Sequence, residues 1–186
     1  MKFIKLTTLT ILVFLLVVIL LRGWIFRQIV AYHVVGQKYT YSTTDKKLIE
    51  YIEINIGEKK VLDIEDIIEL GLSETARQLN FAISQNDNDP NKLIFSKTAH
   101  CIGYAAFFTT TCNYLLKKYD YGDKWQAKTQ IGKLSLFGVD IHQFFNSAFF
   151  KDHDFVTIEN KVTGEILTVD PTINDYLYID FVSLKK

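Results

Sequence analysis

The chain has 186 residues, of which 48% are hydrophobic, and its 21 basic residues balance its 21 acidic residues. This length allows one globular domain of ordinary size beside a targeting segment. Balanced charge gives no reason to expect a nucleic-acid partner. Two cysteines are too few for a disulfide framework, which sets the chain apart from small disulfide-stapled secreted proteins.

The N-terminal segment is predicted to anchor the chain in a membrane. Residues 6–21 carry no charge, and Lys5 and Arg22 flank them. The flanking residues extend the run to bilayer length, and Trp24 suits the interface. The competing interpretation is a secretory signal, but no small-residue cleavage site follows, so we expect an uncleaved single-pass anchor over 1–28. Basic residues nearly balance across the segment, and the short basic tail favours a domain outside the cytoplasm.

Residues 29–60 are predicted to form a membrane-proximal helical linker. Within 45–56, apolar residues recur at helical spacing, namely Leu48, Ile49, Ile52 and Ile56. This face is expected to pack on the domain, with a dimer contact as the alternative, and the sequence does not choose between them.

The domain itself is expected over 61–186, and it begins with helices. Residues 63–86 predict two helical pieces, the first ending at Gly71 and the second beginning at Ser73 as N-cap.

A longer helix is predicted to begin near Cys101 and to end near Lys118, with Thr98 as a residue of N-cap type. Its apolar stripe has a 3.6-residue period and comprises Ala105, Ala106, Phe108, Cys112, Leu115 and Leu116. In the first turn, unpaired N–H groups and the positive end of the helix dipole favour a thiolate at Cys101. Gly103 would let backbone or substrate approach closely. Cys112 lies about 16 Å further along the axis, too far for a disulfide, and is expected to be buried.

The C-terminal third predicts antiparallel strands. Residues 125–137 indicate a strand or hairpin interrupted at Gly132, and 140–150 fit a short helix whose phenylalanines belong to the core or to a groove wall. Strands at 153–158 and 165–169 are joined by a turn at Gly164, and a last strand is expected at 177–184. Helices followed by an antiparallel sheet give an α+β fold class.

Three chemistry-bearing residues follow one another along these elements. Cys101 begins a helix, His153 begins one hairpin strand and Asp170 ends its partner. Antiparallel pairing places the start of the first strand beside the end of the second, so His153 and Asp170 are predicted neighbours.

These stretches resemble the transglutaminase-like family of papain-like cysteine enzymes. The matching stretches are Cys101-Ile102-Gly103-Tyr104-Ala105, Asp152-His153-Asp154-Phe155-Val156 and Val169-Asp170-Pro171-Thr172, and the resemblance covers roughly Asp63 to Tyr178. The chain departs from the family at Ala99, where Gly is common, and at Phe155, where Trp is common.

The resemblance implies a papain-like core and a Cys-His-Asp triad. Cys101 would attack an amide carbonyl of a protein or peptide, His153 would transfer the proton, and Asp170 would orient the imidazole. The thioester would pass to water or to an amine, with hydrolysis favoured, and no cofactor or metal is required. The backbone N–H of Cys101 would serve the oxyanion, and no second donor is identified.

Two alternatives remain. Each triad residue has an ordinary structural role when taken alone, so the domain is alternatively a non-catalytic, membrane-tethered binding or assembly module. A zinc site would gather His100, Cys101, His142, Asp152 and His153, but no HExxH and no CxxC pair is present to favour it.

Overall fold

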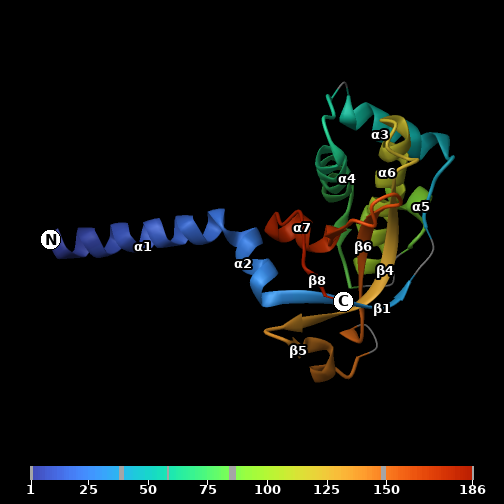
Figure 1. Ribbon diagram of the computed structural model, residues 1–186. Helices are drawn as coiled ribbons and strands as arrows, with labels where there is room; N and C mark the ends of the chain where they lie inside the picture. Colours follow the sequence, from blue (N-terminus) through green and yellow to red (C-terminus); the bar gives the residue numbers. More distant parts are fainter. Residues whose placement is uncertain (1, 38–39, 58, 84–86, 148–149, 186) are drawn as a thin grey trace.

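The computed structural model describes residues 2–37, 40–57, 59–83, 87–147 and 150–185, and for residues 2–5 it describes the backbone alone. The expected role of the Lys5 side chain therefore lies outside the described residues. The chain is a mixed α+β structure (Figure 1). Its helices are α1 Lys2–Leu20, α2 Arg22–Ile29, α3 Lys46–Ile56, α4 Ile64–Gln78, α5 Pro90–Ser96, α6 Cys101–Lys118, the short 3₁₀ helix Ile141–Phe144, and α7 Pro171–Leu177.

The strands form one main sheet and one small parallel pair. They are β1 Val30–Gln37, β2 Asn80–Phe81, β3 Thr98–Ala99, β4 Trp125–Leu136, β5 Val139–Asp140, β6 His153–Asn160, β7 Ile166–Val169 and β8 Leu184–Lys185. The main sheet runs β7-β6-β4-β1-β8, and β5 pairs with the end of β4. The pairs made by β4, β6 and β7 are antiparallel, as expected, but β8 pairs with β1 in parallel.

The main core lies between the helices and the sheet. Helix α6 packs against β4 and β6 on one side and against α4 on the other. All six residues of the predicted apolar stripe are buried, but Phe107 and Thr109 to Thr111 are buried as well, so burial of α6 extends beyond the predicted face. A smaller cluster around Tyr32 and Phe155 lies apart from this core and includes residues of the C-terminal segment.

Strand β1 changes the expected domain boundary. Residues 30–37, taken as part of a helical linker, form a strand between β4 and β8. Helix α3 buries Leu48, Ile52 and Ile56 in the main core, so its apolar face packs on the domain as expected. Residues 30–37 and 46–56 therefore belong to the same folded body as the rest of the domain.

Two glycines that the sequence suggested as breaks lie inside continuous elements. Helix α4 passes through Gly71, where an added Cβ would stand 3.0 Å from Cε2 of Phe108. Strand β4 passes through Gly132, where an added Cβ would stand 2.3 Å from Cε1 of Phe155. Both predicted breaks are wrong because each glycine makes room for a neighbouring aromatic ring rather than for a turn.

The N-terminal segment consists of two helices rather than one. Helix α1 projects away from the folded body (Figure 1), and Leu6–Leu20 and Arg22–Ile29 are bent by 68° at the break between them. No single helix in the described residues is long and apolar enough to cross a bilayer, although this bent pair satisfies the length and composition together. Arg22 donates from Nε to the carbonyl oxygens of Leu177 and Tyr178, at 2.9 and 3.0 Å, so it contacts the end of α7.

The C-terminal strand expected at 177–184 is wrong over most of its length. Pro171 begins helix α7, with Asp170 as N-cap, and the helix ends at Leu177 before a left-handed Tyr178. Only the last predicted residue, Leu184, is in a strand. Residues 178–183 are irregular, although the N–H of Val182 donates to the carbonyl oxygen of Thr168 and the carbonyl oxygen of Ser183 accepts from the backbone N–H of Tyr32.

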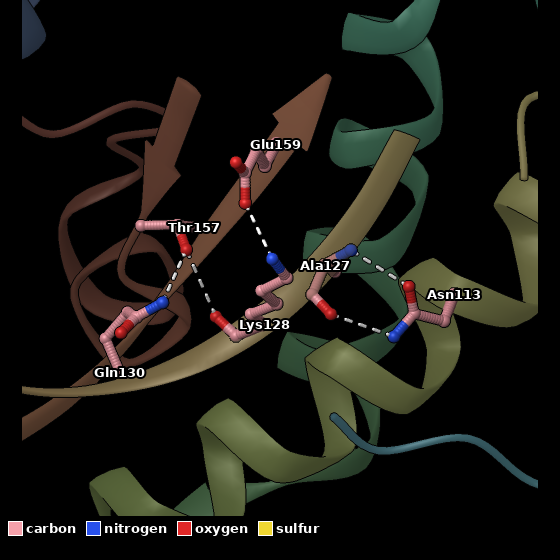
Figure 2. Close-up of polar contacts among 6 residues, drawn as sticks. All are labelled: Asn113, Ala127, Lys128, Gln130, Thr157 and Glu159. Carbon is pink, nitrogen blue, oxygen red and sulfur yellow. Dashed lines mark hydrogen bonds and ion pairs between the residues drawn. The ribbon is translucent and has the colours of Figure 1, made fainter. Parts of the chain in front are cut away.

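One asparagine binds α6 to the free side of β4 (Figure 2). Asn113 accepts from the backbone N–H of Ala127 at 2.9 Å, and its Nδ2 donates to the carbonyl oxygens of Ala127 and Tyr41 at 3.0 and 2.9 Å. β1 pairs with β4 only as far as Gln130, so this part of β4 has no partner strand on the side away from β6 in the described chain. The asparagine amide supplies the two hydrogen bonds that a further strand would otherwise make.

Candidate active site

The helix of the candidate nucleophile begins at Cys101, as predicted, but with a different cap. His100 is extended, with φ −102° and ψ −173°, and its Nδ1 accepts from the backbone N–H of Ile102 at 3.3 Å. Thr98 lies in β3, so the predicted N-cap is wrong. The histidine cap leaves Cys101 in the first turn, where backbone N–H groups have no partner within the helix.

The glycine after the cysteine has a packing role. An added Cβ at Gly103 would stand 2.7 Å from Cβ of Ala99 and 3.5 Å from the carbonyl oxygen of Asp87. The space expected for backbone or substrate is therefore taken by the chain just before the helix. This close approach holds β3 against the first turn of α6 and so fixes the position of Cys101.

The predicted pairing of His153 with Asp170 is confirmed. Strands β6 and β7 pair in antiparallel register, with Val156 opposite Val169, and this places the start of β6 near the residue after β7. His153 Nε2 lies 2.7 Å from Oδ2 of Asp170, with the imidazole side chain 17% exposed and the carboxylate fully buried.

Asp170 has further partners that the sequence did not indicate. Its Oδ1 accepts from the backbone N–H groups of Thr172 and Ile173, at 3.0 and 3.2 Å, and so caps α7. Its Oδ2 also accepts from the hydroxyl of Tyr32 at 2.7 Å. Tyr32 is fully buried on β1, and it was missed because residues 29–60 were interpreted as a linker outside the domain. Only the pairing of β1 with β4 brings it to the site.

The contacts of the site favour an imidazolium-carboxylate pair. Burial raises the pKa of Asp170, but His153, the hydroxyl of Tyr32 and the backbone lower it more, so the net direction is below its usual value. Burial lowers the pKa of His153, but Asp170 and then Cys101 raise it well above its usual value. The pKa of Tyr32 is raised by burial and by Asp170, so its hydroxyl stays protonated and donates. The ring of His153 is thus held as a cation by Asp170.

Cys101 joins this pair. Its side chain is partly exposed and makes a hydrogen bond with the His153 imidazole, which contributes to the raised pKa of that ring. The structure therefore brings together all three residues that the sequence singled out. By contrast, Cys112 is fully buried, and burial raises the pKa of its thiol to about 12, which leaves it without nucleophilic character at neutral pH.

A cavity of about 290 Å³ opens at Cys101 and His153. Most of its wall is apolar and comprises Phe81, Leu134, Ile141, Phe145, Phe150 and Ile173. The polar residues on the wall, besides Cys101 and His153, are Asp152, His142 and Thr172. Phe145 and Phe150 line the cavity, as expected of a groove wall, but Phe144 is exposed and does not line it, and Phe149 lies outside the described residues.

The proposed zinc ligands do not form a cluster. In the described part of the chain, no three His, Cys, Asp or Glu side chains gather in a way that could hold a metal ion. His100 caps α6, and Nδ1 of His142 instead bonds the carbonyl oxygen of Phe150 at 2.7 Å. His142 and Thr172 line the cavity without having been predicted as site residues. In the sequence, His142 was named only as a possible zinc ligand, and Thr172 only as the last residue of the stretch Val169-Asp170-Pro171-Thr172.

Comparison with protein-family models, with curated proteins and with solved structures found no match to this chain.

Proposed function

We propose that this chain is a cysteine hydrolase of transglutaminase-like type, acting on amide bonds of proteins or peptides. The observation that supports it most is the contact chain Cys101–His153–Asp170, with His153 and Asp170 joined at 2.7 Å beside an apolar cavity. A papain-like core is part of this proposal, and so is attachment to a membrane through the N-terminal segment, with the domain on the extracytoplasmic side.

The first half of the reaction makes a thioester. The Cys101 thiolate adds to the carbonyl carbon of the amide, and the His153 imidazolium gives its proton to the amide nitrogen as the C–N bond breaks. The amine leaves and the acyl group stays on sulfur. Asp170 keeps the ring oriented and its charge stabilised throughout, and Tyr32 and the α7 backbone hold Asp170 in place.

The second half restores the enzyme. Water attacks the thioester carbon and gives a proton to His153, and the C–S bond breaks to return the thiolate and the carboxylic acid. An amine in place of water would give transamidation. The backbone N–H of Cys101, in the first turn of α6, is placed to stabilise the oxyanion of both steps.

A second candidate function is supported by the other roles of Asp170. Its carboxylate caps α7 and accepts from Tyr32, so a non-catalytic binding module would keep this residue for the sake of the fold. His153 would then be a buried partner of Asp170. The two functions differ in the reactivity of Cys101, because only an enzyme needs a thiolate near neutral pH.

The deciding experiment measures the rate of iodoacetamide labelling of Cys101 against pH, on the full chain in detergent. A Cys112→Ser background removes the second thiol, and His153→Ala is the test variant. We expect labelling of Cys101 to persist at pH values at which an ordinary thiol no longer reacts, because a neighbouring imidazolium favours the reactive thiolate. The His153→Ala variant should lose labelling at the lower pH values.

The opposite result would favour the binding module. If Cys101 reacts only as an ordinary thiol does, and His153→Ala leaves the pH profile in place, the proposed hydrolase is wrong. If both variants remain folded across the pH range of the labelling, the profiles report chemistry rather than loss of the fold.

A further inference from the structure

His142 lies on the cavity wall, and only one of its two ring nitrogens has a hydrogen-bond partner among the described residues. Nδ1 is 2.7 Å from the carbonyl oxygen of Phe150. A carbonyl oxygen only accepts, so Nδ1 carries the proton, and in the neutral ring Nε2 is then a hydrogen-bond acceptor. The Phe150 contact thus sets the tautomer and makes Nε2 ready to receive a donor.

That acceptor has no partner among the residues the structure describes. His142 is 9% exposed, and its Nε2 is buried without a hydrogen bond. A buried unpaired polar atom costs about 1–3 kcal/mol, so such atoms are rare unless a ligand or water completes them.

A second polar group without a hydrogen-bond partner in the described chain lies on the same wall. The hydroxyl of Thr172 is also buried and has no hydrogen bond within the described chain. A hydroxyl can donate or accept, so Thr172 does not restrict the ligand, whereas the fixed acceptor of His142 requires a donor. The rest of the wall is mainly apolar and includes Leu134, Phe145 and Ile173. A fitting ligand therefore has an apolar side chain and an N–H group close to the reacting carbonyl.

We propose that His142 determines specificity: its Nε2 accepts the backbone N–H of the substrate residue that donates the acyl group, and the apolar side chain of that residue fills the cavity. The inference rests on the proposed hydrolase function, since it places the acyl group of that reaction. It narrows the substrate to peptide bonds that follow a residue with an apolar side chain and a free amide N–H.

The test uses two covalent probes on the full chain in the Cys112→Ser background. N-acetyl-phenylalanyl chloromethyl ketone presents the apolar side chain and the N–H, and its N-methyl analogue lacks only the N–H. In each case the Cys101 sulfur displaces chloride to form a thioether. We expect N-methylation to lower the labelling rate roughly tenfold, each rate being divided by that of iodoacetamide on the same variant.

Two substitutions separate the nitrogens of the ring. His142→Asn keeps an amide donor where Nδ1 bonds Phe150 but has no atom at the Nε2 position, and His142→Gln places an acceptor near that position. The N-methyl effect should vanish in the Asn variant and return at least in part in the Gln variant, a pattern that a merely structural histidine would not give.

The outcomes distinguish this inference from the function it depends on. An ordinary-thiol profile with iodoacetamide overturns the hydrolase itself. Two results would overturn the role of His142 while leaving the hydrolase in place, provided that Cys101 reacts as an activated thiolate. One is equal labelling rates for the two ketones, and the other is an N-methyl effect that is unchanged in His142→Asn. If the Asn variant fails to fold, the comparison of the two ketones on the unaltered chain still decides the point.

Discussion

The two ends of α6 differ in the hydrogen bonding of Asn113 and His142 and in the exposure of their cysteines. Towards the C-terminal end, the amide of Asn113 bonds the backbone of Ala127 (Figure 2) and also the carbonyl oxygen of Tyr41, and the neighbouring Cys112 is buried in the core. At the N-terminal end, Cys101 is partly exposed on a cavity, and His142 on the cavity wall keeps an unpartnered nitrogen within the described chain.

This contrast shows that residue type does not decide chemistry. Cys101 and Cys112 lie on one helix, yet only the first has a cationic ring beside it, and burial raises the pKa of the second to about 12. Buried polar groups that serve stability are paired, because an unpaired one costs free energy. Two unpaired groups of the described chain, Nε2 of His142 and the hydroxyl of Thr172, lie on the cavity wall where we place the substrate, although others, such as the hydroxyl of Thr111 on α6, lie elsewhere.

The largest expected effect separates the two cysteines. In the folded full chain at neutral pH, iodoacetamide should label Cys101 at least about 10³-fold faster than Cys112, because Cys112 becomes accessible only on unfolding, which costs about 5–15 kcal/mol in ordinary domains. Peptide mass spectrometry over time measures both rates. In strong denaturant the two should approach each other, and similar rates in the native state would contradict the contrast.

The C-terminal end of α6 should depend on Asn113 for the stability of the fold. Asn113→Leu removes three hydrogen bonds and leaves the backbone of Ala127 unpaired, so the free energy of unfolding should fall by about 3 kcal/mol. Urea denaturation gives this value. Lys128→Met is the matched control, because it breaks only the partly exposed ion pair with Glu159, worth less than about 1 kcal/mol. Equal losses in both would refute the special role of Asn113.

At the N-terminal end of α6, stability and the labelling of Cys101 should both depend on the absence of a side chain at Gly103. Gly103→Ala brings a Cβ to 2.7 Å from that of Ala99, and such overpacking typically lowers stability by about 2 kcal/mol. Because Gly103 is in the turn that holds Cys101, labelling of Cys101 should also change. Adding Ala99→Gly should restore most of both properties. If the double variant is no better than the single one, the close contact is not the cause.

The ion pair predicts a pH dependence of stability. The pKa of His153 is raised in the folded chain, so its contribution is complete below about pH 6.5 and is lost above it, by up to about 1.4 kcal/mol per pH unit until the folded pKa is passed. The pKa of Asp170 is lowered, so its contribution is present above about pH 4 and is lost on further acidification.

Urea denaturation of the unaltered chain and of His153→Gln, at several pH values, measures this dependence. The difference between the two free energies of unfolding should be greatest between the two limits and should shrink as the pH rises above them. A difference that is constant across pH would show that His153 is not charged in the folded chain.

The smallest expected effect concerns the cap of α6. His100→Ala removes the acceptor for the backbone N–H of Ile102, and at 3.3 Å we expect a loss of about 0.5 kcal/mol. His100→Ser should restore or exceed the original stability, since serine is a stronger N-cap. Thermal unfolding measures both, and a large loss in the Ala variant would mean that His100 has a role beyond capping.

Periodicity and local chemistry sufficed for several elements. The helix from Cys101 to Lys118, the hairpin of β6 and β7 and the burial of Cys112 all follow from patterns within about twenty residues. The breaks expected at Gly71 and Gly132 were wrong because a glycine that admits a ring from a distant segment looks the same in sequence as one that ends an element. The strand expected at 177–184 was wrong because α7 extends to Leu177 and the chain is irregular over 178–183.

The sequence by itself determined the pairing of His153 with Asp170, since a hairpin is a local structure whose register places its two ends together. Only the tertiary structure decided that β1 joins the sheet and brings Tyr32 to Asp170, and that the 3₁₀ segment turns His142 onto the cavity wall. The bond from Tyr32 to Asp170 joins residues more than a hundred positions apart, and the orientation of His142 depends on the carbonyl oxygen of Phe150. A local pattern of apolar and polar residues predicts neither contact.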